Sequence, residues 1–104
     1  MATAEKRRTR RDAPERRVVD RVQTGVRIER RILQVLKAFA SSKGMSVGDL
    51  LEGIILHAFD GVAPFGAESL KKIAALKQVY GLDLKAEHSH LLVERVKGGR
   101  APTR

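Results

Sequence analysis

Residues 22–28 read Val-Gln-Thr-Gly-Val-Arg-Ile, and this short stretch determines the architecture that we expect for the chain. Apolar or β-branched residues alternate with others, which is typical of a β-strand with one buried face. The face expected to be buried consists of Val22, Thr24, Val26 and Ile28. The opposite face consists of Gln23, Gly25 and Arg27. The sequence therefore predicts a strand over residues 22–28.

Helical periodicity follows this stretch. From Glu29 onward the apolar residues recur in one stripe, which predicts a first helix that ends at Gly44 in a left-handed C-cap. Ser46 and Asp49 resemble a capping box at the start of a second helix, which continues through Phe59. A third helix is expected over about 67–80, and a fourth, capped by Asp83, over about 84–97.

A single strand cannot satisfy its own backbone hydrogen bonds, so it needs a partner. A second copy of the chain can supply one if two strands pair antiparallel about a two-fold axis. The second helix is apolar over more than half of its circumference and would bury its spare face in the same dimer. The residues expected in the dimer core are Val26, Ile28, Leu36, Leu51, Ile55 and Phe59.

The order of strand, helix, Lys-Gly-Met-Ser-Val turn over residues 43–47, and helix resembles the ribbon-helix-helix (Arc/MetJ-type) family of DNA-binding proteins, over residues 22–60. The resemblance implies a mainly α fold with one intermolecular β-strand pair, to which the sequence adds two C-terminal helices. The expected organisation is a disordered basic arm (1–20), a dimerisation and DNA-binding domain (21–61), a helical extension (62–97) and a disordered tail (98–104).

The charge distribution favours a polyanionic partner. The 104 residues carry a net charge of +9, and residues 1–43 contain 13 Lys and Arg against 5 Asp and Glu. Such asymmetry is typical of proteins that bind nucleic acid. The longest apolar run, residues 53–59, is interrupted by His57 and is too short to span a bilayer. We therefore expect double-stranded DNA as partner, no membrane, and a cytoplasmic, nucleoid-associated location.

The family resemblance implies particular contacts with DNA. The polar face of the strand would enter the major groove, where Gln23, Gly25 and Arg27 would contact bases. Arginine can bind guanine through two hydrogen bonds, and glutamine can bind adenine in the same way. Free N–H groups at the start of the second helix would bind a phosphate. The residues expected to contact phosphates are Arg21, Arg30, Arg31, Lys43, Ser46, Val47 and Gly48, although an exposed helix face also explains several of these charges.

The sequence gives no positive sign of an enzyme. It has no cysteine, no phosphate-binding glycine loop and no ordered catalytic set. His88 and His90 are two positions apart and would face different sides of the expected helix, which disfavours a shared metal. No cofactor or metal is therefore expected.

The leading functional hypothesis is a homodimeric, sequence-specific DNA-binding protein that acts as a transcriptional repressor. One alternative is an antitoxin, or a plasmid partition or conjugation accessory protein, whose residues 62–97 bind a protein partner. Another is a protein that binds nucleic acid through charge alone. A simpler interpretation of residues 62–97 is that they enlarge the core.

Overall fold

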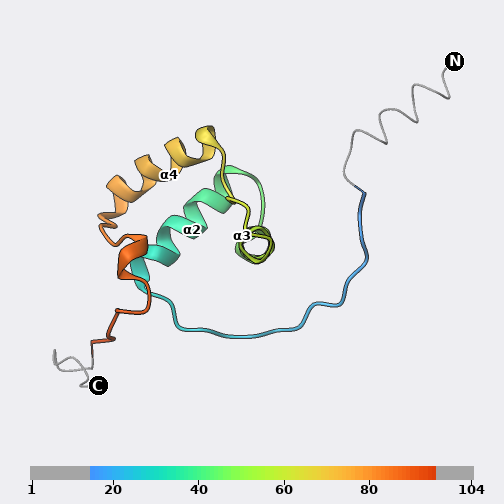
Figure 1. Ribbon diagram of the computed structural model, residues 1–104, viewed down its shortest axis with the longest axis horizontal. Helices are drawn as coiled ribbons and strands as arrows, with labels where there is room; N and C mark the ends of the chain where they lie inside the picture. Colours follow the sequence, from blue (N-terminus) through green and yellow to red (C-terminus); the bar gives the residue numbers. More distant parts are fainter. Residues whose placement is uncertain (1–14, 96–104) are drawn as a thin grey trace, which may run out of the picture.

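The structure, a computed structural model, describes residues 15–95 and is built on three α-helices (Figure 1). The elements are α2 (Arg30–Ser42), α3 (Val47–Phe59), α4 (Ala67–Tyr80) and the short 3₁₀ helix η1 (Ala86–His88). Helix α2 packs against both α3 and α4. Within residues 15–95, no helix is long and apolar enough to cross a membrane. Residues 1–14 of the expected arm and the whole expected tail lie outside the described residues.

Helix α2 starts and ends where local chemistry favours it. The Glu29 carboxylate accepts a hydrogen bond from the backbone N–H of Ile32 at 3.0 Å, which caps the first turn. At the other end, Gly44 has a φ of 72°, a left-handed conformation that glycine adopts without steric cost. The expected first helix and its glycine terminus are confirmed.

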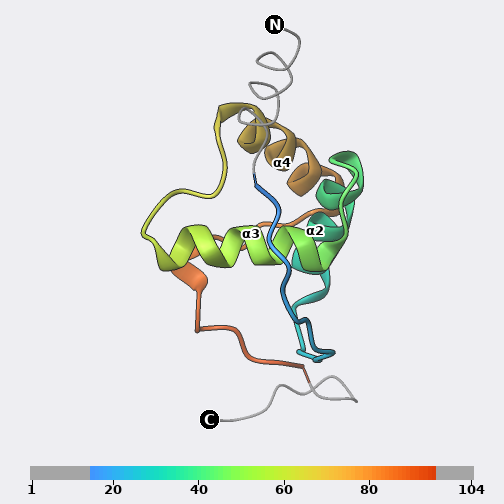
Figure 2. The same cartoon turned by 90° about the vertical axis from the view of Figure 1, so that its right-hand side faces the viewer.

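Helix α3 has one end held by a cap and an apolar surface that is only partly covered. The Ser46 hydroxyl accepts a hydrogen bond from the backbone N–H of Asp49 at 3.1 Å, as expected for an N-cap. Leu50 is the only buried residue of this helix. Figure 2 shows α3 in profile, with the chain that precedes α2 passing across it. The expected second helix is therefore confirmed, although part of its apolar surface, including Leu56 and Phe59, faces solvent.

The core lies between α2 and its two neighbouring helices. Phe39, Ala40 and Leu50 form its buried centre. Phe65, in the connection after α3, meets Phe39 edge to face, with ring centroids 5.4 Å apart. Residues of α4 complete this cluster, namely Ile73 and Leu76. Helix α4 has the expected bounds and ends at Gly81, which has a left-handed φ of 66°. Its Ile73 and Leu76 thus pack against the core, although no residue of α4 is itself buried.

Residues 22–28 correct the expected fold class. They form no strand, and residues 15–95 contain no β-strand at all, so the expected intermolecular strand pair of a ribbon-helix-helix fold is wrong for this structure. Val22 is 84% exposed and Val26 is 72% exposed. The alternating pattern describes which faces a strand would have, but it does not supply the neighbouring strand that would accept and donate its backbone hydrogen bonds. The segment is instead an irregular chain exposed to water.

The fourth helix expected over residues 84–97 is also wrong, because within residues 84–95 only the three-residue η1 forms. Asp83 does not cap a helix, since its carboxylate accepts a hydrogen bond from Arg31. His90 has a φ of 67°, which a right-handed helix cannot accommodate. Leu91 and Leu92 are adjacent and exposed, so they give no continuous apolar face that packing could stabilise as a helix. Residues 62–95 therefore contain one α-helix, α4.

Candidate nucleic-acid interface

Residues 15–29, called here the extended segment, carry the arginines expected to contact DNA. The first of these, Arg21, donates through Nε to Glu52 Oε2 at 2.7 Å and through Nη2 to Glu52 Oε1 at 2.8 Å. Glu52 lies on α3, so this ion pair joins the extended segment to that helix. The side-chain hydrogen bonds from Arg21 lower the pKa of Glu52 below its ordinary value. Arg21 therefore holds an anionic group in the two-pronged geometry that guanidinium also uses for phosphate.

Arg27 makes a similar pair at the other end of the extended segment. Its Nε donates to Glu94 Oε1 at 3.1 Å, and its Nη2 contacts the second carboxylate oxygen. Glu94 belongs to residues 82–95, called here the C-terminal segment. Hydrogen bonds from Arg27 lower the pKa of Glu94. The Arg27 side chain is nevertheless 83% exposed, so it also remains accessible to a ligand in solution.

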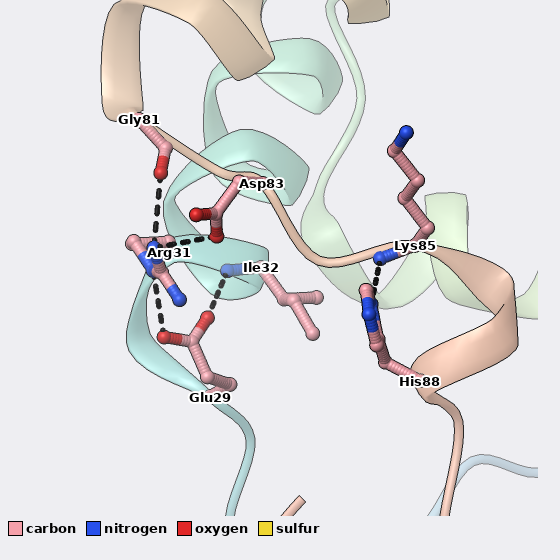
Figure 3. Close-up of polar contacts among 7 residues, drawn as sticks. All are labelled: Glu29, Arg31, Ile32, Gly81, Asp83, Lys85 and His88. Carbon is pink, nitrogen blue, oxygen red and sulfur yellow. Dashed lines mark hydrogen bonds and ion pairs between the residues drawn. The ribbon is translucent and has the colours of Figure 1, made fainter. Parts of the chain in front are cut away.

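Arg31 has a different environment from these two arginines (Figure 3). Its Nε donates to Glu29 Oε2 at 2.9 Å, and its Nη1 donates to Gly81 O at 3.0 Å and to Asp83 Oδ1 at 3.1 Å. The side chain is only 33% exposed. These bonds fasten the start of α2 to the chain that leaves α4. The expected phosphate contact of Arg31 stays a prediction, and a phosphate would compete with these hydrogen bonds. The neighbouring Arg30 is exposed, and its expected phosphate contact also stays a prediction.

The turn between α2 and α3 brings the remaining expected phosphate contacts together. Ser46 uses its hydroxyl to cap the helix, while the N–H groups of Val47 and Gly48 make no hydrogen bond within residues 15–95. Lys43 is exposed and places its Nζ 5.8 Å from the centroid of the Phe39 ring. This end of α3 thus has unpaired N–H donors, which can bind an anion, although the first turn also contains the acidic Asp49.

Gln23 and Gly25, the other expected base contacts, are exposed in the extended segment. A Cβ atom added at Gly25 would meet no other described atom within 4 Å. Its φ is not left-handed either, so the described fold has no steric need for glycine at this position. Close approach of another molecule would explain a requirement for glycine at this position.

The residues expected in the dimer core fall into two groups. Leu36 packs on the core, while Ile28 and Leu51 are half-buried. The others are exposed, and Phe59 is 80% accessible to solvent. Two further exposed residues, which the sequence analysis missed, extend this surface. We define the α3 apolar patch by its members Ile55, Leu56, Phe59 and Val62.

The partners Glu52 and Glu94 were also missed, because they lie 31 and 67 positions from their arginines and no local spacing indicates such pairs. In the described part of the chain, no three His, Asp or Glu side chains come together in a group that could hold a metal. No known protein family, curated protein or solved structure matches this chain. Its function therefore has to be argued from its own residues.

Proposed function

We propose that this chain is a homodimeric, sequence-specific DNA-binding protein that acts as a transcriptional repressor. The observation that carries the proposal is the exposed extended segment, in which Arg21 and Arg27 each hold a carboxylate in two-pronged geometry. Carboxylate and phosphate present similar pairs of oxygens to a guanidinium group. A DNA phosphate or the edge of a guanine can therefore replace either carboxylate.

The overall charge supports an extended polyanion as the ligand. The net charge of +9 becomes +18 in a dimer, and most of the excess lies in residues 1–43, which include the arginines described above. Each DNA phosphate that is neutralised releases counterions and makes the dependence of affinity on salt steeper by about 0.9 in logarithmic slope. A small acidic ligand would give a much shallower dependence.

In this proposal, residues of the extended segment recognise the DNA sequence. Arg27 can donate two hydrogen bonds to guanine, and Gln23 can pair with adenine in the major groove. Gly25 lies between them and has no side chain to keep the backbone away from the base edges. Because all three residues are exposed, DNA can reach them without disturbing the helical core.

The dimer is assigned to the α3 apolar patch. Its exposed members include Leu56 at 63% and Phe59 at 80% accessibility, on a helix that has only one buried residue. A group of exposed large apolar side chains is typical of a contact with another molecule. A second copy related by a two-fold axis would present the same patch and cover both surfaces at once.

The test is DNA binding by the full chain and by two variants that lose the same charge. Arg27→Gln removes a proposed DNA contact, whereas Lys71→Gln removes a charge from the exposed surface of α4. On a labelled duplex of about 30 base pairs, three helical turns, fluorescence anisotropy should show tight, salt-dependent binding by the wild type. Arg27→Gln should weaken it about tenfold, and Lys71→Gln much less. Equal losses of DNA affinity in the two variants, or no DNA binding by the wild type at low salt, would contradict the proposal.

A second candidate function is an antitoxin, or a plasmid partition or conjugation accessory protein, that binds a protein through residues 62–97. Helix α4 needs no such partner, because Ile73 and Leu76 pack into the core. The observation in favour of a protein partner is the exposed apolar run Leu91–Val93 in the C-terminal segment. A Leu91→Ser substitution should weaken a protein contact there and leave DNA affinity unchanged.

A further inference from the structure

The C-terminal segment returns from the end of α4 to the extended segment (Figure 2). Side-chain contacts fasten it at two points. Near its start, Asp83 accepts a hydrogen bond from Arg31 on α2 at 3.1 Å. Near its end, Glu94 pairs with Arg27. The segment thereby places one of its own carboxylates on the arginine to which the proposed function assigns base recognition.

Packing does little to hold the end of this segment. The three residues before Glu94 are exposed, with Leu91 at 70% accessibility. The pair itself is also exposed, since 83% of the Arg27 side chain and 58% of the Glu94 side chain are accessible. Ion pairs in such positions are weak and are screened by salt. The contact can therefore be opened by a stronger anionic competitor without unfolding the core.

The Arg21 pair differs in this respect. Glu52 lies in the middle of α3, a helix anchored in the core through Leu50. Glu52 therefore cannot move away from Arg21 in the way that Glu94, near the end of a loosely packed segment, can move away from Arg27. Of the two carboxylates, Glu94 is thus the one whose chain can move away when another ligand arrives.

We propose that the C-terminal segment is an internal competitor of DNA, in which Glu94 occupies Arg27 until DNA displaces it. This inference rests on the proposed function, because it assumes that Arg27 contacts DNA. One guanidinium group cannot make the same two hydrogen bonds to Glu94 and to a base or phosphate at once. Binding of DNA then requires release of Glu94, and a partner that captures residues 91–95 would increase DNA affinity.

The test compares two full-length variants that remove the same charge from the same segment. Glu94→Gln removes the competitor, whereas Glu87→Gln removes an exposed carboxylate that is 3.8 Å from His88 and makes no ion pair with an arginine in the described residues. At pH 8, where histidine is ordinarily neutral, Glu94→Gln should increase affinity for a 30-base-pair duplex by about two- to fivefold. Glu87→Gln should increase it much less.

A second comparison identifies Arg27 as the site of competition. In a protein that already carries Arg27→Gln, Glu94→Gln should increase DNA affinity no more than Glu87→Gln does. Without DNA, the NMR signal of the Arg27 Nε–H group should shift in the Glu94→Gln variant and stay in place in Glu87→Gln. If Glu94→Gln and Glu87→Gln alone increase DNA affinity equally, the proposed competition by Glu94 is wrong, although the protein still binds DNA. Absence of binding by every variant, wild type included, would overturn the proposed function and this inference with it.

Discussion

Arg21 and Glu52, which are 31 positions apart, form a two-pronged ion pair with nitrogen–oxygen distances of 2.7 and 2.8 Å. One partner lies in a segment without regular secondary structure, and the other lies on α3. The pair thus ties the extended segment to the helix whose first turn presents free N–H groups. Before DNA binds, it therefore holds both parts of the proposed DNA interface on one body.

This ion pair should be visible in the titration of Glu52. Its pKa is lowered by the hydrogen bonds from Arg21, so the pair contributes fully above about pH 4.3, the ordinary glutamate value, and is lost as the pH falls through the lowered pKa. NMR titration of the carboxyl carbons should therefore show a higher pKa for Glu52 in an Arg21→Gln variant. Glu94, whose pKa is lowered by hydrogen bonds from Arg27, serves as the control and should titrate identically in both proteins. An unchanged Glu52 titration would mean that the pair does not form in solution.

The core should depend strongly on Phe39, which is only 2% exposed and contacts Phe65. Truncation to alanine removes a buried ring and leaves a cavity between α2 and its neighbours. Phe39→Ala should lower the free energy of unfolding by about 3–5 kcal/mol. Urea unfolding followed by circular dichroism measures this change.

Phe59 gives the opposite expectation, because it belongs to the exposed α3 apolar patch. Phe59→Ala should barely change the stability of a single chain, yet it should weaken the proposed dimer. Sedimentation equilibrium would detect the shift toward monomer. A monomeric wild type, or a dimer that tolerates this substitution, would exclude the patch as the dimer surface.

Gly25 should matter for DNA binding and not for folding. A Cβ at this position meets no described atom within 4 Å, so Gly25→Ala should change the free energy of unfolding by less than about 0.5 kcal/mol. In the proposed complex, the added methyl group keeps the backbone away from the base edges and should lower affinity several-fold. If the variant binds DNA as tightly as the wild type, close approach at Gly25 is not part of recognition.

Removing the chain after Gly61 should unfold the protein. The truncation deletes Phe65, Ile73 and Leu76, all of which pack on the buried cluster around Phe39. Circular dichroism should then show loss of the helical signal well beyond the share that α4 contributes. A fragment that stays helical and binds DNA would instead indicate that residues 62–104 serve a partner.

Elements with local start and stop signals were predictable from the sequence. Gly44 and Gly81 end α2 and α4 in left-handed conformations, and Ser46 starts α3, because each of these signals acts within a few residues. The wrong predictions concern segments whose structure depends on residues far away in the sequence. Asp83 binds Arg31 instead of capping a helix, and the alternation over residues 22–28 finds no neighbouring strand.

The candidate site was predictable only as a set of residue types. The family resemblance and the alternating pattern pointed to Arg27, but not to what its side chain contacts in the folded chain. Arg27 precedes the three helices in the sequence and Glu94 follows them, so their pairing joins two segments that are far apart in the chain. Such contacts depend on the complete fold, and no spacing rule within one sequence contains them.

Selection of duplexes from a random pool by the full-length protein, followed by sequencing, tests whether the chain recognises DNA by sequence. We predict enrichment of one pseudo-palindromic motif, whose half-sites are separated by about one helical turn as expected for a two-fold dimer. Arg27→Gln should lose preference at one defined position in each half-site. A pool that stays random after repeated rounds, although the protein retains DNA, would contradict sequence-specific recognition.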